Sequence, residues 1–501
     1  MKQDDLRKGF TGAIYNYLGM FFEKLVTVLV TIYVIRQLPI SEFGVYNLFQ
    51  DTIGLVAVIF SFGIPSLIER FLPELYQRGL FDDLHRWVYR ALIARFLLGL
   101  LGALICLLGR DALGGFLHSD LFTAYYPIFA LGLIFTILNQ TSQSILDTYL
   151  LQKRRNVIRV VVSALRAGLY TAAITLGQGL YGILWAFSIS ALAGSVLFVH
   201  TIYRLKHPKN VEKNTEGLGE LTNRFKRYGA ISYLNEMGAM VLSRRADNYL
   251  ISAFLNPAAV GIYSFATRIV EMFVAMTPLV VGNVIISTLL FRQFTETPTL
   301  EFLQRRFNLL CKLALYLTLP FLIVLVGLHE QITMLVDPKY HDASYLLALV
   351  AIFEILNVFA WPIAWMAQSS ERVEVQLYSK IGAIYNIIAA IILIPRYGPL
   401  GAAWATGTSF MMKNVLMYVF LRRHLPLTFP GPGIFKLGLS GFASWVALAL
   451  LAQYAGSVIS ALAISLLGML IFAVCAKLLA PFNDDERDSF EKALGRKIWL
   501  V

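Results

Sequence analysis

Apolar runs of about 20 residues or more alternate with short polar segments along most of the chain. Folded as an α-helix, a run of this length crosses the roughly 30 Å hydrocarbon core of a bilayer at about 1.5 Å per residue. The pattern therefore predicts an all-α polytopic membrane protein with about fourteen transmembrane helices. The predicted spans are residues 12–36, 44–69, 87–109, 121–148, 156–177, 180–203, 228–253, 259–290, 308–329, 343–367, 374–395, 398–421, 434–454 and 456–479. The last two spans follow each other closely, and a re-entrant pair is the alternative at this position.

The composition supports a membrane location. Of the 501 residues, 57% are apolar and 15% are charged, and the mean hydropathy is +0.65. Soluble domains carry about 25% charged residues. The first apolar run follows a charged start and is too long for the apolar core of a signal peptide, so we interpret it as a retained first span.

The net charge of +12 is mostly a signal of membrane topology. Most Lys and Arg residues lie in predicted loops on the side of the N-terminus, whereas the loops on the opposite side hold only Arg36, Arg110, Lys339 and Arg396. By the positive-inside rule, this asymmetry predicts that both termini lie in the cytoplasm. We expect the protein in the cell (inner) membrane. We therefore expect no nucleic-acid partner.

Two sequence blocks recur in the second half of the chain. Residues 12–14, Gly-Ala-Ile, recur as residues 229–231, and at the same offset Gly44 matches Gly261. Near the end of each half, the pattern Gly-x-x-Gly-x-x-Trp-Ala occurs at residues 179–186 and 398–405. Small residues at such spacings let membrane helices pack closely, and two blocks in the same order indicate an internal repeat.

The repeat predicts how the chain is organised. Each half holds six predicted spans, so both halves enter the membrane from the same side and form two six-helix lobes in a parallel repeat. Two such lobes around a cleft are typical of alternating-access transporters. We expect an N-terminal lobe with its cytoplasmic linker at residues 1–226, a C-terminal lobe at 227–430, two further spans at 431–479 and a cytoplasmic tail at 480–501.

Short motifs also connect the chain to a known family. The stretch Arg36-x-Leu38-Pro39-x-x-x-Phe43-Gly44-x-Tyr46 is similar to the one after the first span of bacterial and archaeal polysaccharide-export flippases. Asp247, the Gly261-x-Tyr263 block and the Gly-x-x-Gly-x-x-Trp-Ala blocks extend the similarity over residues 5–425. The chain thus resembles the polysaccharide-export (lipid-linked oligosaccharide) flippase family of the multidrug/oligosaccharidyl-lipid/polysaccharide (MOP) exporter superfamily.

The resemblance implies a function in cell-surface polysaccharide biosynthesis. The expected substrate is a polyprenyl-pyrophosphate-linked oligosaccharide, moved from the cytoplasmic to the outer leaflet. The resemblance further implies that spans 1, 2, 7 and 8 line the central cleft, and it suggests a polysaccharide polymerase and glycosyltransferases as partners.

Several basic residues within the predicted spans are candidates for substrate binding. Ionisable side chains are costly in hydrocarbon, so they usually face a cavity or a partner. Arg245, Arg166 and Arg95 have no acidic neighbour at i±3 or i±4, and an arginine can donate two hydrogen bonds to one phosphate. The further candidates are Lys24, Arg268 and Arg244. For the last two, an ion pair with the acid three residues on, Glu271 or Asp247, is the alternative.

Membrane carboxylates are candidates for ion coupling or gating, because a buried carboxylate changes its protonation with its surroundings. These candidates are Asp51, Asp247, Glu271 and Glu354. At the offset of the repeat, Asp51 falls on Arg268, so we expect these two to pair when the outer ends of the lobes close. The alternative pairs Arg268 with Glu271 and Asp51 with another neighbour.

Other charged residues, among them Arg90, Arg159 and Lys312, are predicted near the cytoplasmic ends of their spans. We expect their charged groups to reach water, and we expect the charged tail from Pro481 to be solvated. Pro65 in the second span predicts a bend, because proline frees a backbone carbonyl.

The chain carries no sequence motif of catalysis. It has no GxxxxGK[ST] phosphate loop, no HExxH and no GxSxG, and its His residues are scattered. We therefore expect no enzyme, no cofactor and no metal site. One alternative is a drug or organic-cation antiporter of the same superfamily, although the predicted spans are net basic where such a protein needs an acidic cleft. Another is a membrane-embedded polysaccharide polymerase, which the short outer loops disfavour.

Overall fold

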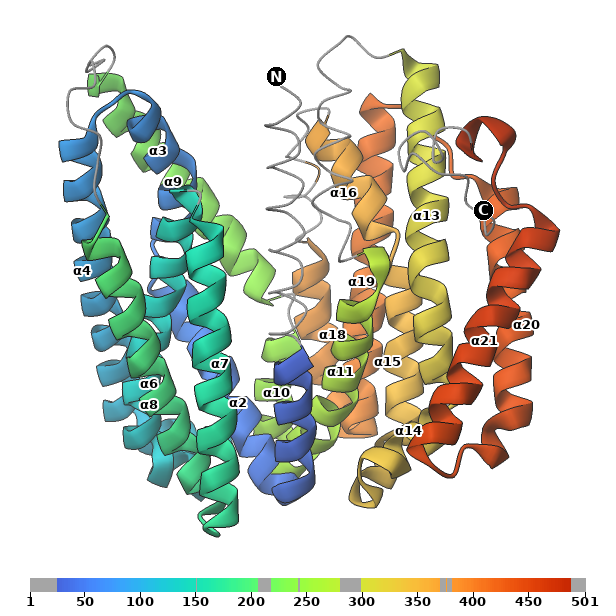
Figure 1. Ribbon diagram of the computed structural model, residues 1–501, viewed down its shortest axis with the longest axis horizontal. Coiled ribbons are helices and arrows are strands. Elements are labelled where there is room, and N and C mark those ends of the chain that lie inside the picture. Colours follow the sequence, from blue (N-terminus) through green and yellow to red (C-terminus); the bar gives the residue numbers. More distant parts are fainter. Residues whose placement is uncertain are drawn as a thin grey trace. The chain divides into compact units, whose positions relative to one another are not determined.

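The computed structural model describes residues 25–149, 151–205, 218–241, 244–279, 299–369, 375 and 381–487. Within these ranges all regular secondary structure is helical, which confirms the predicted all-α class (Figure 1). The chain divides into two compact units, Met1–Gly261 and Ile262–Val501, and each is described here by itself. The boundary between these units differs from the lobe boundary at 226/227 that the repeat predicts, and the lobe assignment stays a prediction.

The first unit is built from long helices joined by short turns. A helix at Leu25–Gln37 opens the described part. It is followed by α2 (Ile40–Ile59), α3 (Ile64–Gln77), α4 (Phe81–Leu108), α5 (Arg110–Phe116), α6 (Asp120–Thr148), α7 (Gln152–Thr175), α8 (Gly179–Tyr203), α9 (Leu218–Val241) and α10 (Arg244–Phe254). Helix α11 (Pro257–Met276) begins in this unit and continues into the second.

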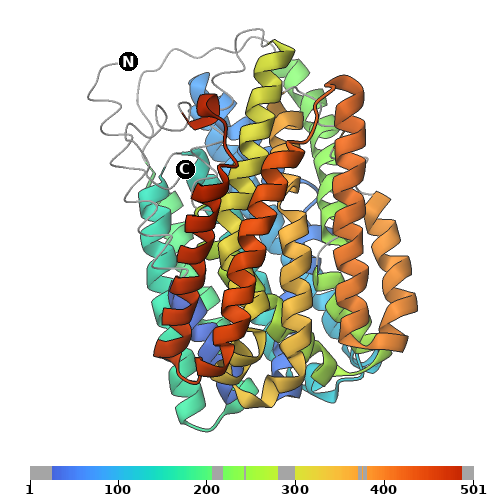
Figure 2. The ribbon, with the colours of Figure 1, turned by 90° about the vertical axis from the view of Figure 1, so that its right-hand side faces the viewer.

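The second unit continues in the same way. Its helices are α13 (Leu300–Gly327), α14 (His329–Val336), the 3₁₀ helix η1 (Pro338–Ala343), α15 (Ser344–Asn357), α16 (Ala360–Ser369), α18 (Ile381–Tyr397), α19 (Pro399–His424), α20 (Gly431–Leu451), η2 (Ala452–Tyr454) and α21 (Val458–Leu479). Helices α20 and α21 run side by side next to α13 (Figures 1 and 2).

Nine helices in the described residues are long and apolar enough to cross a membrane, and a bent pair adds a tenth. The number of about fourteen spans stays a prediction, because part of the first predicted span and part of the span at 374–395 lie outside the described residues. Helices α20 and α21 both pass this test of length and composition, which favours two spans over a re-entrant pair.

The helices differ in how much apolar surface they bury. In α13, 72% of the apolar stretch is buried inside the protein, whereas in α21 the share is 22% and in α7 it is 11%. Apolar side chains that stay outside the protein core are suited to lipid. Helix α13 is therefore a core helix of the second unit, whereas α7 and α21 lie at the periphery of their units.

The second predicted span is broken, as Pro65 suggested. Helices α2 and α3 are bent by 57° relative to each other. Between them, Phe62 and Gly63 have positive φ angles of 46° and 71°, and Pro65 lies in the first turn of α3, where its missing N–H costs no hydrogen bond. The break leaves carbonyl groups at the end of α2 that need partners.

The expectation that Lys312 reaches water is wrong. Lys312 in α13 is 4% exposed, and its Nζ donates to both carboxylate oxygens of Glu486 at 2.7 and 3.0 Å. The chain after α21 folds back over α13, where Phe482 packs on Leu309 and Leu313. This docked segment, residues 480–487, removes water from Lys312 and supplies its counter-charge, whereas Asn483, Asp484 and Asp485 within it stay exposed.

Candidate functional site

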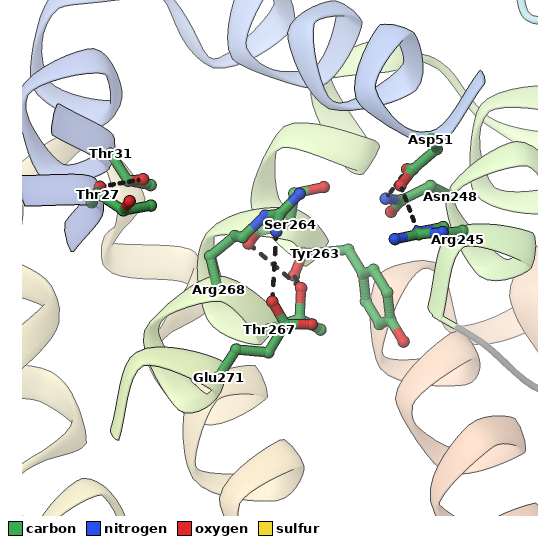
Figure 3. Close-up of polar contacts among 10 residues, drawn as sticks. All are labelled: Thr27, Thr31, Asp51, Arg245, Asn248, Tyr263, Ser264, Thr267, Arg268 and Glu271. Atoms are coloured by element: carbon green, nitrogen blue, oxygen red, sulfur yellow. Dashed lines mark hydrogen bonds and ion pairs between the residues drawn. The ribbon is translucent and has the colours of Figure 1, made fainter. Parts of the chain in front are cut away.

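A polar cluster joins α2 to α10 in the first unit (Figure 3). Asp51 of α2 is 3% exposed, and one of its oxygens accepts a 2.6 Å hydrogen bond from the amide of Asn248. The other lies 4.0 Å from Nε of Arg245. Arg245 and Asn248 are three residues apart and therefore share a face of α10. A neighbouring hydrogen bond of 2.7 Å between the hydroxyls of Thr52 and Tyr249 ties the same two helices together.

Arg245 keeps most of its donors available. Its side chain is 54% exposed, and Asp51 is its one ion-pair partner among the described residues. The guanidinium lies over Gly54, where a Cβ atom would come within 2.3 Å of Nη1. A glycine at this position of α2 thus leaves the space that the arginine occupies. Since a guanidinium carries five N–H donors and the Asp51 contact is long, Arg245 can bind an anion while staying near Asp51.

Arg95 has a different environment. It is 1% exposed in α4, and its guanidinium donates to the carbonyls of Phe60 at 2.8 Å and Ala57 at 3.3 Å and to the hydroxyl of Thr141 at 3.2 Å. Phe60 and Ala57 lie at the C-terminal end of α2, where a positive charge is favourable. Arg95 thus supplies the hydrogen bonds that the break after α2 removes.

Glu236 of α9 lies on the other side of the same break. Its carboxylate accepts hydrogen bonds from the hydroxyls of Ser66 at 2.7 Å and Ser61 at 3.0 Å. This places a negative charge at the N-terminal end of α3, again the favourable end. Tyr233, one turn earlier on α9, donates to the carbonyl of Ile59 at 2.9 Å. Residues of α4 and α9 therefore stabilise the broken span.

In the second unit, Arg268 and Glu271 form the expected i,i+3 pair on α11. Nη1 of Arg268 lies 3.4 Å from the carboxylate of Glu271, and both side chains are partly exposed, at 39% and 47%. The hydroxyl of Thr267 on the same helix bonds to the carbonyls of Tyr263 and Ser264 (Figure 3). The pairing of Asp51 with Arg268 stays a prediction.

Glu354 belongs to a polar group between α15 and α19. Its carboxylate accepts a 3.2 Å hydrogen bond from Asn357, whose amide oxygen accepts one of 3.1 Å from Lys413. Glu354 and Asn357 also line a small cavity with Thr318 of α13. The hydroxyl of Thr318 is buried and has no hydrogen-bond partner among the described residues. The cavity therefore has a carboxylate, an amide and an unsatisfied hydroxyl in its wall.

The remaining predicted site residues are dispersed. Arg166 of α7 donates to the hydroxyl of Ser190 at 3.0 Å and lies 5.2 Å from the ring of Phe187, so it is held against α8. Arg244 is the first residue of α10, and Asp247 in its first turn is 0% exposed. Their pairing stays a prediction. Lys24 lies outside the described residues.

Sequence reasoning missed the neutral partners. Asn248, Tyr249 and Asn357 organise the charged groups, but an uncharged amide or hydroxyl in a span gives no strong signal in sequence. Glu236 and Lys413 are ionisable residues within predicted spans, and this signal alone could have placed them among the candidates.

Comparison with known sequences places the chain in a family. The family described as "Polysaccharide biosynthesis protein" matches residues 10–297, more than half of the chain. The probable low-salt glycan biosynthesis flippase Agl15 of Haloferax volcanii is 25% identical over 398 residues, which cover 79% of each chain.

Two solved structures show the same fold. The lipid II flippase MurJ in an inward closed conformation has a TM-score of 0.68 at 15% identity, covering 96% of this chain and 100% of that one. An inward-facing multidrug resistance transporter of the MATE family, of the MOP superfamily, has a TM-score of 0.65 at 17% identity, covering 83% of this chain and 98% of that one. The chain therefore belongs to the family described as "Polysaccharide biosynthesis protein" and is a multi-pass membrane protein with the fold of these two solved structures.

Proposed function

We propose that the protein is a flippase that moves a polyprenyl-pyrophosphate-linked oligosaccharide from the cytoplasmic to the outer leaflet by alternating access. It acts in the cell membrane, with both termini in the cytoplasm, for cell-surface polysaccharide biosynthesis. The relationship to Agl15, which is named as a probable glycan biosynthesis flippase, supports this assignment. The fold shared with the lipid II flippase MurJ is consistent with it.

The observation that carries the proposal is the state of Arg245. A pyrophosphate needs a cation that is accessible, held in place and still able to donate hydrogen bonds. Arg245 is half-exposed, rests in the space above Gly54 and lies 4.0 Å from the buried carboxylate of Asp51. We propose that Arg245 contacts the pyrophosphate and that Asp51 orients it.

The other basic candidates take secondary roles in this proposal. Arg166 and Arg268 are partly accessible. Arg166 donates a hydrogen bond to Ser190, and Arg268 pairs with Glu271. Arg244 and Lys24 are further candidates for the substrate. Arg95 donates its hydrogen bonds to the end of α2, so we propose a positioning role for it in place of substrate contact.

We further propose that a membrane carboxylate couples transport to an inward flow of H⁺ or Na⁺. The candidates are Asp51, Asp247, Glu271 and Glu354. Glu354 is the strongest of these candidates, because it lines a cavity together with Thr318, whose buried hydroxyl has no hydrogen-bond partner in the described part of the chain. Oxygen ligands of this kind suit a hard cation.

The proposal is tested by reconstituting the purified protein in vesicles with a lipid-linked oligosaccharide and measuring its transfer between leaflets. Arg245→Ala should reduce the rate roughly tenfold or more, because a charge-assisted contact to phosphate is lost. The matched control is Arg86→Ala, which removes an exposed arginine that pairs with Asp83 on the surface of α4.

Two outcomes would contradict the proposed function. Unchanged transfer by both Arg245→Ala and Arg166→Ala, in protein that inserts normally, would reject the proposed site. Transfer of an organic cation in place of the lipid-linked glycan would favour the antiporter alternative.

A further inference from the structure

A groove on the first unit is left unused by the proposed transport site. It lies between α3, α4 and α9, three helices that Figure 1 shows close together at one end of the unit. The groove encloses about 170 Å³, enough for several methylene groups. Ile64 and Ile68 of α3 form one wall, Ala94 of α4 lies opposite, and Phe225 of α9 closes it.

Aromatic contacts hold this groove open. Phe225 packs edge-on against Phe71 of α3, with ring centroids 4.2 Å apart, and against Trp87 of α4 at 4.9 Å. Rigid rings at these positions keep α3, α4 and α9 at a fixed spacing. The packing of these helices therefore fixes the groove, and its wall is apolar except at one residue, Arg90.

Arg90 is the one charged residue in the wall of this groove. Its side chain lines the groove, is exposed, and makes no hydrogen bond or ion pair with any residue that the structure describes. Other arginines of this unit have acidic partners: Arg86 pairs with Asp83 at 2.7 Å, and Glu74 pairs with Arg224 at 3.3 Å as well as with Arg70 and Arg78. An unpaired cation at the edge of an apolar groove indicates a ligand that is both anionic and apolar.

The depth of Arg90 in the bilayer identifies the kind of anion. Helix α4 has 28 residues and is about 42 Å long, so it exceeds the roughly 30 Å hydrocarbon core by about eight residues. Counted back from Leu108 at the far end, Arg90 lies about 27 Å along the helix, where hydrocarbon meets the headgroups. Trp87, one turn further, is typical of this interface. Phosphate groups of lipids lie at this level.

We propose that this groove binds one anionic phospholipid, with an acyl chain along the wall formed by α3 and α4 and the phosphate on the guanidinium of Arg90. An arginine binds phosphate through two parallel hydrogen bonds, and the apolar wall makes van der Waals contacts with the acyl chain. The bound lipid would hold α3, the second half of the broken span, against α4. The proposal does not depend on the identity of the transported substrate.

Native mass spectrometry of the full-length protein tests this inference. The protein is exchanged into detergent containing phosphatidylglycerol or phosphatidylcholine with identical acyl chains, and the retained lipid is measured. We expect the wild type to retain one phosphatidylglycerol in preference to phosphatidylcholine. Arg90→Gln should lower retention of phosphatidylglycerol roughly tenfold and leave that of phosphatidylcholine unchanged. Ala94→Trp, which fills the groove, should lower retention of both.

Arg86→Gln is the matched control, since it removes a charge from the same helix outside the groove. The proposal is overturned if Arg90→Gln retains phosphatidylglycerol like the wild type, or if Arg86→Gln loses as much of it as Arg90→Gln. A dimer that Ala94→Trp dissociates would show that a second copy of the chain occupies the groove, and would also overturn it. Quenching of Trp87 by phosphatidylglycerol with brominated chains, absent in Trp87→Phe, gives an independent readout.

Discussion

Gly44 of α2 and Gly261 of α11 face each other's backbone at the point where the first turns of these two helices meet. A Cβ atom on Gly44 would lie 1.8 Å from the carbonyl oxygen of Pro257, and one on Gly261 would lie 2.2 Å from the carbonyl oxygen of Ile40. The two contacts are equivalent, because Ile40 and Pro257 precede their glycines by the same four residues. The glycines that the sequence repeat aligns therefore have the same structural role.

Replacing either glycine by alanine should destabilise the protein. The added methyl group overlaps backbone atoms that cannot move without separating the helices, so we expect a loss of about 1–3 kcal/mol or more for Gly44→Ala and for Gly261→Ala. Thermal unfolding in detergent measures the change. Gly168→Ala on α7 is the control: nothing lies within 4 Å of its added Cβ, and alanine is the better helix former, so its stability should rise slightly.

Arg95 should be essential for the stability of the broken span. Arg95→Ala leaves the carbonyls of Phe60 and Ala57 without these hydrogen bonds in an apolar environment, which should cost about 3 kcal/mol. Arg95→Lys keeps the charge but not the planar fork, so we expect a smaller loss. Denaturation by chemical or thermal means in detergent measures both. Wild-type stability of Arg95→Ala, together with loss of substrate binding, would show that Arg95 is a substrate contact instead.

The docked C-terminal segment should depend on one ion pair. Glu486→Met or Lys312→Met alone leaves a buried charge without its partner, and we expect each to cost about 3–5 kcal/mol. The double variant Lys312→Met, Glu486→Met removes both charges and should recover most of that stability. A double-mutant cycle from thermal unfolding gives the coupling energy. Additive effects of the two single changes would contradict the assignment.

The repeat predicts a gate between Asp51 and Arg268. In a background with Cys106, Cys311 and Cys475 replaced by alanine, Asp51→Cys and Arg268→Cys should crosslink in the resting state. The double exchange Asp51→Arg, Arg268→Asp should regain transport that each single exchange loses. The contacts of Asp51 with Asn248 and of Arg268 with Glu271 define the competing outcome, in which no crosslink forms in any state.

Substitutions of Glu354 and Thr318 together distinguish ion coupling by Glu354 from a purely structural role of this cavity. Glu354→Gln should abolish the dependence of transport on an imposed H⁺ or Na⁺ gradient. Thr318→Val removes a buried hydroxyl that has no hydrogen-bond partner in the described part of the chain, so it should raise the stability of a protein whose cavity binds nothing. If the hydroxyl is a cation ligand, the same change should instead weaken stabilisation by that cation. A transport rate that does not change when all ion gradients are collapsed would refute coupling.

The fold class followed from the sequence alone, because lipid imposes one strong constraint. Every spanning segment must satisfy its own backbone hydrogen bonds, so long apolar runs become helices wherever they lie in the chain. The repeat is likewise visible in sequence, since a close helix crossing tolerates only glycine, as Gly44 and Gly261 show. The bend after α2 could be expected from Pro65, because proline within a long apolar span interrupts the backbone hydrogen bonds of the helix.

The partners of the charged residues were decided by tertiary structure. Asp51 and Arg245 are far apart in sequence, and only the packing of α2 on α10 brings them within 4.0 Å. The sequence predicts Lys312 at the edge of the membrane, but in the structure the docked segment places Glu486 in contact with it. Arg95 has no acidic residue at i±3 or i±4, and it donates to backbone carbonyls, which every residue carries and no sequence pattern marks. The hydrophobic periodicity of the sequence indicates which helix faces are apolar, whereas the pairing of polar groups depends on which helix faces meet in the fold.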